Sequence, residues 1–477
     1  MAEDFCIVPA CANEYTRGHP LLFHALGGLW IKIFGNNFVS LRSFAFFITI
    51  TLQYSCFFVG CKLFNPRSGF YISSILLLQN IIFAQAIFLF PEIFLALTAI
   101  WTFYFYLKKK TTGYLISAFL LCLIKEQGSL LLLSFFLWEI VSNVRNYGFK
   151  FYLNINELFK LSLLIIPSIG IVVFLLLQKV QKGYWFYPEH INLISLDLKH
   201  SGYQFKTALK LLTTESGRYI ISFLFVVCFL IYGKIKPTAT RILMLIMAFT
   251  SLEIVSIKWD IPIPVLIIII IPIVFLVLYR FIFADEEQGI KLPYIGPSLF
   301  FIFVYLAFCS FNFFTDRYLA MVLPFLVLIF VGLTDHWISS NWTKNILFIS
   351  IIFLSTFNLR NLNGFGDTSP KNYQMIRLHQ KIINYALTSH WEKKNILTTF
   401  IMKNNMVNVS SGYVKKNQVF ENTTNIYLNH MPKPEYVIFF PYEIDKNINS
   451  FVQSNNCKKL IEIKFEDAIA LIYKVQP

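Results

Sequence analysis

The stretch FPEIFLALTAIWTFYFYLKKK, residues 90–110, decides the fold class of this 477-residue chain. It carries Glu92 near its start, continues without a charged residue, and ends in Lys108, Lys109 and Lys110. A run of this length crosses the ~30 Å hydrocarbon core of a bilayer when it is helical. Lysines concentrate on the cytoplasmic side of membrane proteins. The stretch therefore predicts a transmembrane helix with Glu92 at its outer end and the lysines inside.

The composition of the whole chain supports the same class. Hydrophobic residues make up 56% of it and charged residues 14%, with a mean hydropathy of +0.60. Soluble domains carry about 25% charged residues. The net charge of +15 is explained by basic residues in short loops between apolar runs, so it indicates membrane topology and not binding of nucleic acid. The lipid bilayer is the expected environment.

About twelve apolar runs are long enough to be spans, which predicts an all-α polytopic membrane protein. The interval 112–125 is short for a span. The runs cover residues 40–62, 69–87, 89–107, 112–125, 126–143, 159–178, 217–233, 239–257, 261–281, 293–311, 317–334 and 344–358.

Alternate loops between these runs are rich in Lys and Arg, which predicts that both chain ends lie outside. Residues 1–39 are then a first external loop, ending in an amphipathic stretch from His19 to Gly35 that lies along the membrane interface. Residues 40–358 form the transmembrane domain, with a long external loop at 179–216. The expected location is a bacterial inner membrane.

After residue 359 the composition becomes more polar, which predicts a small external, periplasmic α/β domain over 359–477. Strand-like runs cover Ile396–Met402 and Tyr436–Phe440, and a helix-like stretch covers Tyr373–Leu387. Lys459–Tyr473 is typical of two strands around a turn.

Ionisable residues of the membrane part gather near the expected outer helix ends, where charges are costly and indicate function. Ordinary interpretations stay open for them. Glu92 suits a helix start, Lys125 and Glu126 can pair with each other, and Arg317 can extend into the headgroups. Several others are equally compatible with plain loop or turn positions. The candidates are Glu14, His19, Glu92, Lys125, Glu126, Glu189, His190, Asp260 and Arg317.

Four passages resemble the GT-C superfamily of membrane glycosyltransferases. The relatives are bacterial members of glycosyltransferase family 39, the dolichyl-phosphate-mannose–protein mannosyltransferase type, together with the aminoarabinose transferases of lipid A. The order and spacing of the passages make the set specific. They are GHPLLFHALGGLWIKIFG (18–35), FPEIFLALTAIWTFYFYLKKK followed by LCLIKEQG (90–110 and 121–128), GYWFYPEHINLI (183–194) and FNFFTDRYLAMVLPFLVLI (311–329).

The resemblance implies transfer of a sugar from a polyprenyl phosphate to a glycan, lipid or protein acceptor, at the outer face. Such chemistry needs a carboxylate to take the acceptor's proton and a cation at the departing phosphate, either Arg, Lys or a divalent metal such as Mg²⁺ or Mn²⁺. Arg317 is expected at the lipid phosphate, and Glu92 at a metal or the acceptor. The substrate-binding set is His19, Glu92, Lys125, Glu126, Glu189, His190 and Arg317.

Members of the family carry an essential acidic residue, usually Asp, in the first external loop, after a first transmembrane helix. Glu14 and Asp4 are the candidates for this catalytic acid here. Because the chain opens with neither a signal peptide nor that helix, we expect that the native start lies upstream. Two alternatives remain open, a flippase or transporter of lipid-linked saccharides and a catalytically degenerate paralogue.

Overall fold

The computed structural model describes most of the chain and forms two compact units. The first comprises the described residues within Met1–Leu26, Phe47–Gln85 and Phe90–Asn361, and the second those within Gly27–Phe46, Ala86–Leu89 and Leu362–Pro477. The described residues are 18–148, 155–188, 191, 194, 197–213, 218, 221, 293–312, 314–361, 364–425, 432–442 and 446–476.

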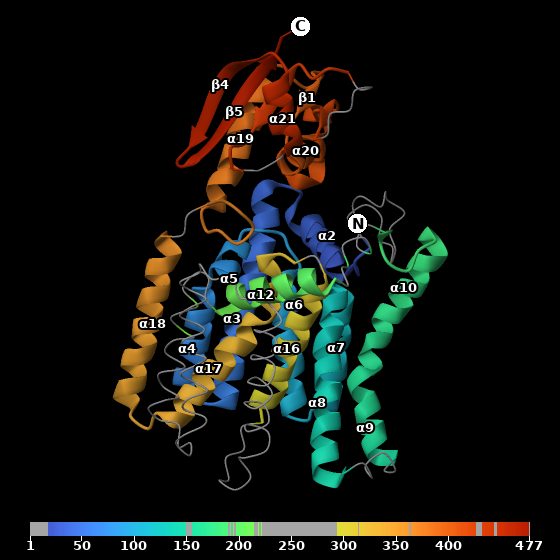
Figure 1. Cartoon of the computed structure of the whole chain (residues 1–477), viewed down its shortest axis with the longest axis vertical. Helices are drawn as coiled ribbons and strands as arrows, with labels where there is room; N and C mark the ends of the chain where they lie inside the picture. Colours follow the sequence, from blue (N-terminus) through green and yellow to red (C-terminus); the bar gives the residue numbers. More distant parts are fainter. Residues whose placement is uncertain are drawn as a thin grey trace. The chain divides into compact units, whose positions relative to one another are not determined.

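The first unit is helical (Figure 1). Helices α2 (Leu22–Phe34) and α3 (Phe38–Leu63) contribute residues to both units. The other helices are α4 (Pro66–Leu77), α5 (Asn80–Gln85), α6 (Glu92–Leu107), α7 (Thr111–Ile124), α8 (Ser129–Tyr147), α9 (Ile155–Ile165), α10 (Ile169–Lys182), α12 (Leu198–Thr213), α16 (Ile295–Phe311), α17 (Leu323–Trp337) and α18 (Asn341–Asn361). Short 3-10 turns cover η1 (Glu126–Gly128), η3 (Ile166–Ser168) and η6 (Asp316–Met321).

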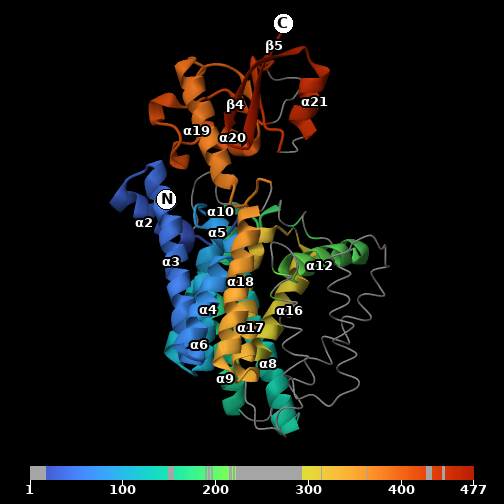
Figure 2. The ribbon, with the colours of Figure 1, turned by 90° about the vertical axis from the view of Figure 1, so that its left-hand side faces the viewer.

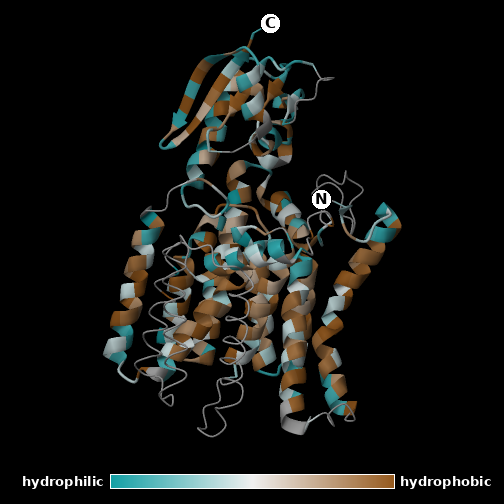
Figure 3. Cartoon of the chain, in the orientation of Figure 1, coloured by the Kyte–Doolittle hydropathy of each residue, from teal (hydrophilic) through white to brown (hydrophobic). Residues whose placement is uncertain are grey.

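Apolar side chains dominate these helices, as the hydropathy colouring shows (Figure 3). Within the described residues, four helical segments are long and apolar enough to cross a membrane: Phe38–Leu63, Glu126–Val144, Ile155–Lys182 and Asn341–Arg360. Shorter apolar helices include α6, α7, α16 and α17. The chain is therefore a helical membrane protein, while a count of twelve spans stays a prediction.

Some predicted runs differ from the helices found. The run 69–87 is two short helices, α4 and α5, separated at Leu78–Gln79, so one unbroken span there is wrong. The run 317–334 opens with the 3-10 turn η6, and its helix α17 starts only at Leu323. Nearly all of the runs 217–233, 239–257 and 261–281 lie outside the described residues.

Close glycine contacts hold the helices of the first unit together. A Cβ on Gly60 of α3 would lie 2.7 Å from the Cα of Gly69 in α4, and one on Gly69 would lie 2.6 Å from the Phe57 carbonyl oxygen. Helix backbones approach this closely only where small residues meet. Helix α4 starts sharply because Pro66 occupies its first turn and the Asn65 side chain accepts a hydrogen bond from the Ser68 amide. In Figure 2 the long helices run side by side, and α12 crosses near one end of α16.

The second unit contains a five-stranded sheet in the order β2-β1-β3-β5-β4. The strands are β1 (Ile396–Leu397), β2 (Thr423–Thr424), β3 (Tyr436–Phe439), β4 (Cys457–Phe465) and β5 (Ala468–Val475). Strand β1 pairs in parallel with β2 and β3, whereas β5 pairs antiparallel with β3 and β4. Helices α19 (Asn372–Thr388), α20 (Phe400–Val407) and α21 (Lys446–Ser454) complete it, with 3-10 turns η7 (Val409–Ser411) and η8 (Lys416–Gln418).

The predicted elements of this region are largely confirmed. Helix α19, strand β3 and the β4–β5 hairpin lie where the sequence placed them. The strand predicted over Ile396–Met402 is wrong beyond Leu397, because α20 begins at Phe400. The buried Met402 and Met406 lie four residues apart, which is the spacing of one helix face, and both belong to the core of the unit.

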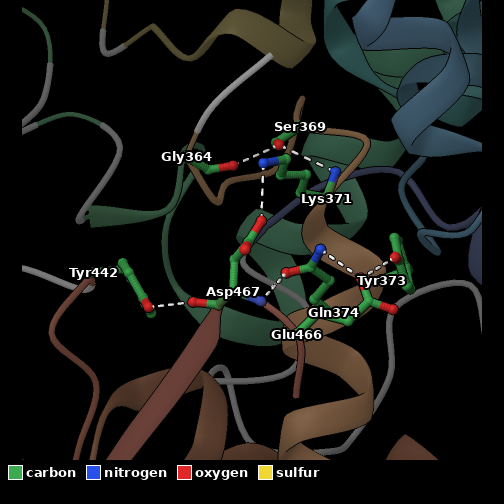
Figure 4. A network of polar contacts seen from close by, with 8 residues as sticks. All are labelled: Gly364, Ser369, Lys371, Tyr373, Gln374, Tyr442, Glu466 and Asp467. Atoms are coloured by element: carbon green, nitrogen blue, oxygen red, sulfur yellow. Dashed lines mark hydrogen bonds and ion pairs between the residues drawn. The ribbon is translucent and has the colours of Figure 1, made fainter. Parts of the chain in front are cut away.

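A polar network ties the β4–β5 turn to the start of α19 (Figure 4). Glu466 adopts a positive φ of 52° in this two-residue turn. Its carboxylate accepts hydrogen bonds from the Tyr373 hydroxyl and, at 2.7 Å, from the Gln374 amide. The Gln374 carbonyl accepts in return from the Asp467 amide at 3.2 Å, and Lys371 pairs with the Asp467 carboxylate at 2.9 Å. The turn is thus fixed by side chains from the first turn of α19.

His379 is buried inside the second unit on α19. Its Nδ1 lies 3.0 Å from the Asn405 amide nitrogen, and its ring meets Phe440 edge to face with centroids 5.1 Å apart. Burial, reinforced by the positive charge of Arg42, lowers the pKa of His379 to about 4. The imidazole is therefore neutral throughout the physiological range.

Candidate functional site

A carboxylate stands at the first turn of α6. Pro91 precedes the helix, and Glu92 is its first residue, where the helix dipole favours a negative charge. The side chain of Glu92 is nevertheless only 2% exposed. A buried carboxylate needs cationic or hydrogen-bonding partners, so its neighbours identify the site.

Two cations from distant parts of the chain supply those partners. Lys125, at the end of α7, places its Nζ 3.1 Å from Glu92 Oε1 and is equally buried. Arg317, in the 3-10 turn η6, places its Nε 3.6 Å from the same oxygen and is 22% exposed. The structure thus brings these three charges together, and their role in binding stays a prediction. The Glu92–Lys125 pair lies in the interior, and Arg317 forms its more exposed side.

Aromatic rings sandwich the two cations. The Lys125 ammonium lies 4.1 Å from the ring centroid of Tyr318, and the Arg317 guanidinium lies 4.2 Å from that of Phe90. Cations over aromatic faces gain electrostatic stabilisation when they are desolvated. Phe90 and Tyr318 were missed as site residues by the sequence analysis, although each is adjacent to or within two residues of a charge that it did name.

A second polar pair lies next to the first along the chain. His19 Nδ1 is 3.0 Å from Glu126 Oε2, and Glu126 opens the 3-10 turn η1 directly after Lys125. The two side chains are 24% and 38% exposed, respectively. Lys125 and Glu126 therefore each form a close ion pair with a residue far away in the chain. The neighbouring Gln127 accepts a hydrogen bond from the Tyr305 hydroxyl at 3.2 Å.

The cluster carries an incomplete set of contacts. Among the described residues, Glu92 Oε2 is buried without a hydrogen-bond partner. One carboxylate, Glu92, faces two cations, Lys125 and Arg317, and Glu126 adds a second carboxylate directly after Lys125. A cluster of paired charges with a buried acceptor and aromatic walls suits a charged ligand with hydroxyl groups.

The remaining predicted site residues are not part of the described structure. The two candidates for the catalytic acid, Glu14 and Asp4, lie outside the described residues, as do Glu189, His190 and Asp260. Of the predicted substrate-binding residues Glu92, His190 and Arg317, the structure describes Glu92 and Arg317, and these two lie together.

The expected contact of Glu92 with a metal or the acceptor stays a prediction. Glu92 Oε1 faces an ammonium and a guanidinium, whose positive charges disfavour a divalent ion at that oxygen. Within the described part of the chain, no group of three or more His, Cys, Asp or Glu is arranged to hold a metal ion.

Comparison with known proteins gives a likeness in structure only. No family model matches the chain, and no curated protein matches it. Two crystal structures of ArnT from Cupriavidus metallidurans are similar along 96% of this chain and 87% of that one. The apo state has 9% identity and a TM-score of 0.38, and the state bound to undecaprenyl phosphate has 12% and 0.36.

At these TM-scores the likeness adds no weight to a functional assignment, and the function is inferred below from the polar site itself.

Proposed function

We propose that this chain is a glycosyltransferase that moves a sugar from a polyprenyl-phosphate carrier to an envelope acceptor. The observation that carries the proposal is the buried Glu92 carboxylate held between Lys125 and Arg317 under two aromatic rings. A membrane protein that binds a charged ligand at a helix end must offer it paired, desolvated charges, because unpaired ones are too costly there.

Arg317 is the residue assigned to the carrier phosphate. It is the more exposed cation of the triad, and a guanidinium presents several donors in a plane that matches phosphate oxygens. Lys125 and Glu92 act as positioning residues. The carboxylate draws both cations together, and the Phe90 ring supports the face of the guanidinium at 4.2 Å.

The transfer itself is a direct displacement with inversion at the anomeric carbon. The acceptor hydroxyl oxygen forms the new bond to that carbon while the bond from carbon to the phosphate oxygen breaks. The leaving phosphate keeps the electron pair, and the Arg317 charge stabilises it. The hydroxyl proton passes to a carboxylate of the first external loop, for which Glu14 and Asp4 are the candidates.

The proposed setting is a bacterial inner membrane, with the site and the polar C-terminal region at the outer face. The support comes from the lysine-rich turn Lys108–Lys110 at the end of α6 opposite Glu92. Helices α6 and α7 are consecutive and antiparallel, so the start of α6 and the end of α7 share one side of the membrane.

The test uses purified full chain and two readouts, because the sugar is unidentified. Undecaprenyl phosphate alone is titrated while the thermal unfolding midpoint is followed, since a ligand that binds the native state raises it. Membranes are also incubated with a labelled polyprenyl-phosphate sugar and cell extract. Arg317→Ala should abolish the thermal shift and the transfer, and Arg317→Lys should recover part of the shift.

Arg377→Ala is the matched control, because Arg377 lies on α19 and contacts Gln380. It should leave both readouts unchanged. A normal carrier-induced shift in Arg317→Ala would refute the assigned phosphate contact. Movement of the intact lipid-linked sugar across vesicle membranes without transfer would favour the flippase interpretation instead.

A further inference from the structure

A cavity lies at the other end of α6 from Glu92. It has a volume of about 450 Å³ and is bounded by the end of α3, the end of α6, the start of α16 and the end of α17. Ligand sites commonly occupy ~300–1,000 Å³. Because α6 has 16 residues, the cavity and the Glu92 cluster are separated by ~24 Å along the helix axis. The cavity is therefore a site of its own.

The cavity contains a buried hydroxyl that the described residues do not satisfy. Tyr294 is 5% exposed, and its hydroxyl has no hydrogen-bond partner among them. The hydroxyl lies over Gly332, where an added Cβ would be 2.5 Å from it and 2.6 Å from Cζ of Phe64. Any side chain at position 332 would thus fill the space in front of Tyr294. A buried polar group without a partner lowers the stability of the fold, so we expect a ligand to supply the missing hydrogen bond to Tyr294.

Besides Asp335 and His336, the polar side chains that line the cavity are the donors Lys108 and Tyr294. The Asp335 carboxylate is already engaged on both oxygens, by Lys344 Nζ at 2.7 Å and by Asn65 Nδ2 at 2.9 Å. Lys108 contributes an exposed ammonium, which donates to the Lys62 carbonyl oxygen at the long distance of 3.4 Å. An ammonium and a phenol hydroxyl beside a neutralised carboxylate favour an anion.

The other walls of the cavity are apolar, which favours an anion that carries a hydrocarbon group. Leu63, Phe64, Leu107 and Pro293 line it together with the polar groups. The Phe64 ring meets Tyr294 edge to face with centroids 5.0 Å apart, so this wall is rigid. A free inorganic anion has no apolar surface to bury against such a wall, whereas the hydrocarbon of an amphiphilic anion is stabilised by burial against it.

We propose that this cavity binds the phosphate headgroup of an anionic phospholipid, with Lys108 and the Tyr294 hydroxyl contacting the phosphate and Phe64 contacting the glycerol and acyl region. The bound lipid fixes the ends of α3, α6, α16 and α17 at one side of the membrane.

The test compares phosphatidylglycerol with phosphatidylcholine and with inorganic phosphate, added to the purified full chain in detergent. Retained lipid is counted by native mass spectrometry, and the unfolding midpoint is followed in parallel. Tyr294→Phe keeps the ring and deletes only the unsatisfied hydroxyl, so the fold is retained. Lys108→Ala removes the cation. Each should weaken phosphatidylglycerol binding about tenfold, the equivalent of one charge-assisted hydrogen bond.

Lys110→Ala is the control, since Lys110 belongs to the same basic turn and does not line the cavity. It should bind phosphatidylglycerol like the parent chain. Unchanged binding in both Tyr294→Phe and Lys108→Ala would overturn the proposal. Equal responses to phosphatidylcholine, or stabilisation by inorganic phosphate as strong as that by phosphatidylglycerol, would overturn the assignment to an anionic lipid.

Discussion

Replacing Glu92 by Gln tests how the charged cluster is built. The amide keeps the size of the side chain but leaves Lys125, whose side chain is 4% exposed, without its carboxylate. Removing one partner of a buried ion pair costs about 3–5 kcal/mol, because the other charge stays desolvated. Arg317 is left facing Lys125, and this repulsion adds to the loss.

Replacing Lys125 by Met should cost less. Glu92 then keeps Arg317 as a partner, because the Nε of Arg317 is 3.6 Å from the carboxylate. The buried negative charge is therefore still compensated. We expect a loss of about 1–3 kcal/mol, the range for an unsatisfied buried polar group. The double variant Glu92→Gln/Lys125→Met should be more stable than Glu92→Gln alone, since no buried cation is then left beside a neutral amide.

Thermal unfolding in detergent measures this order. A thiol-reactive dye is a suitable reporter, because Cys56, Cys122 and Cys309 are free and buried. Glu157→Gln serves as the control, since Glu157 pairs with Lys160 at 2.7 Å on an exposed helix surface, where ion pairs contribute about 0–1 kcal/mol. A Lys125→Met variant less stable than Glu92→Gln, or a double variant with the summed loss of both, would refute the shared-carboxylate geometry.

Three further outcomes follow from the packing. Burial lowers the pKa of His379 from 6.5 to about 4. The stability that the neutral imidazole contributes is therefore complete above pH 6.5 and is lost as the pH falls toward 4. Melting scans should show up to about 3 kcal/mol of acid destabilisation, which His379→Leu should lack. Gly69→Ala should lower the free energy of unfolding by about 1–3 kcal/mol through overpacking against Phe57, seen as a lower melting midpoint, while Gly366→Ala, with nothing within 4 Å, should leave both unchanged. Gln374→Ala should cost about 1–2 kcal/mol by freeing the Glu466 turn, seen as faster amide exchange there.

The meeting of Glu92 and Lys125 was predictable from the chain alone. Two consecutive antiparallel helices return to the same side of a membrane, so a charge at the start of α6 and one at the end of α7 must share an end. The sequence did not decide whether Lys125 pairs with Glu92 or with Glu126. Lys125 is extended, with φ of −160°, and the turn η1 follows at once. This local geometry directs Lys125 to Glu92 and Glu126 to His19.

The C-terminal region shows the limit of pattern reading for short elements. ILTTFIM, residues 396–402, is rich in β-branched and aromatic residues, which favours a strand. Only Ile396 and Leu397 pair in the sheet, between β2 and β3. The later residues follow helical spacing because Met402 and Met406 both enter the core. Tertiary packing therefore decides over propensity, and the buried methionines four residues apart were the available signal.

The break between α4 and α5 extends the same reasoning to the membrane part. Average hydropathy joins residues 69–87 into one span, yet the interval contains Gln79, Asn80 and Gln85, all of them buried. Asn80 begins α5 and accepts a hydrogen bond from Arg218, a residue 138 positions away that is itself 1% exposed. An average cannot register such a contact, because its cause lies in another part of the chain. Polar residues inside an apolar run thus indicate a helix boundary that is set by a hydrogen-bonding or charged partner elsewhere in the chain. The start of α6 at Glu92, which pairs with Lys125 and Arg317, has the same cause.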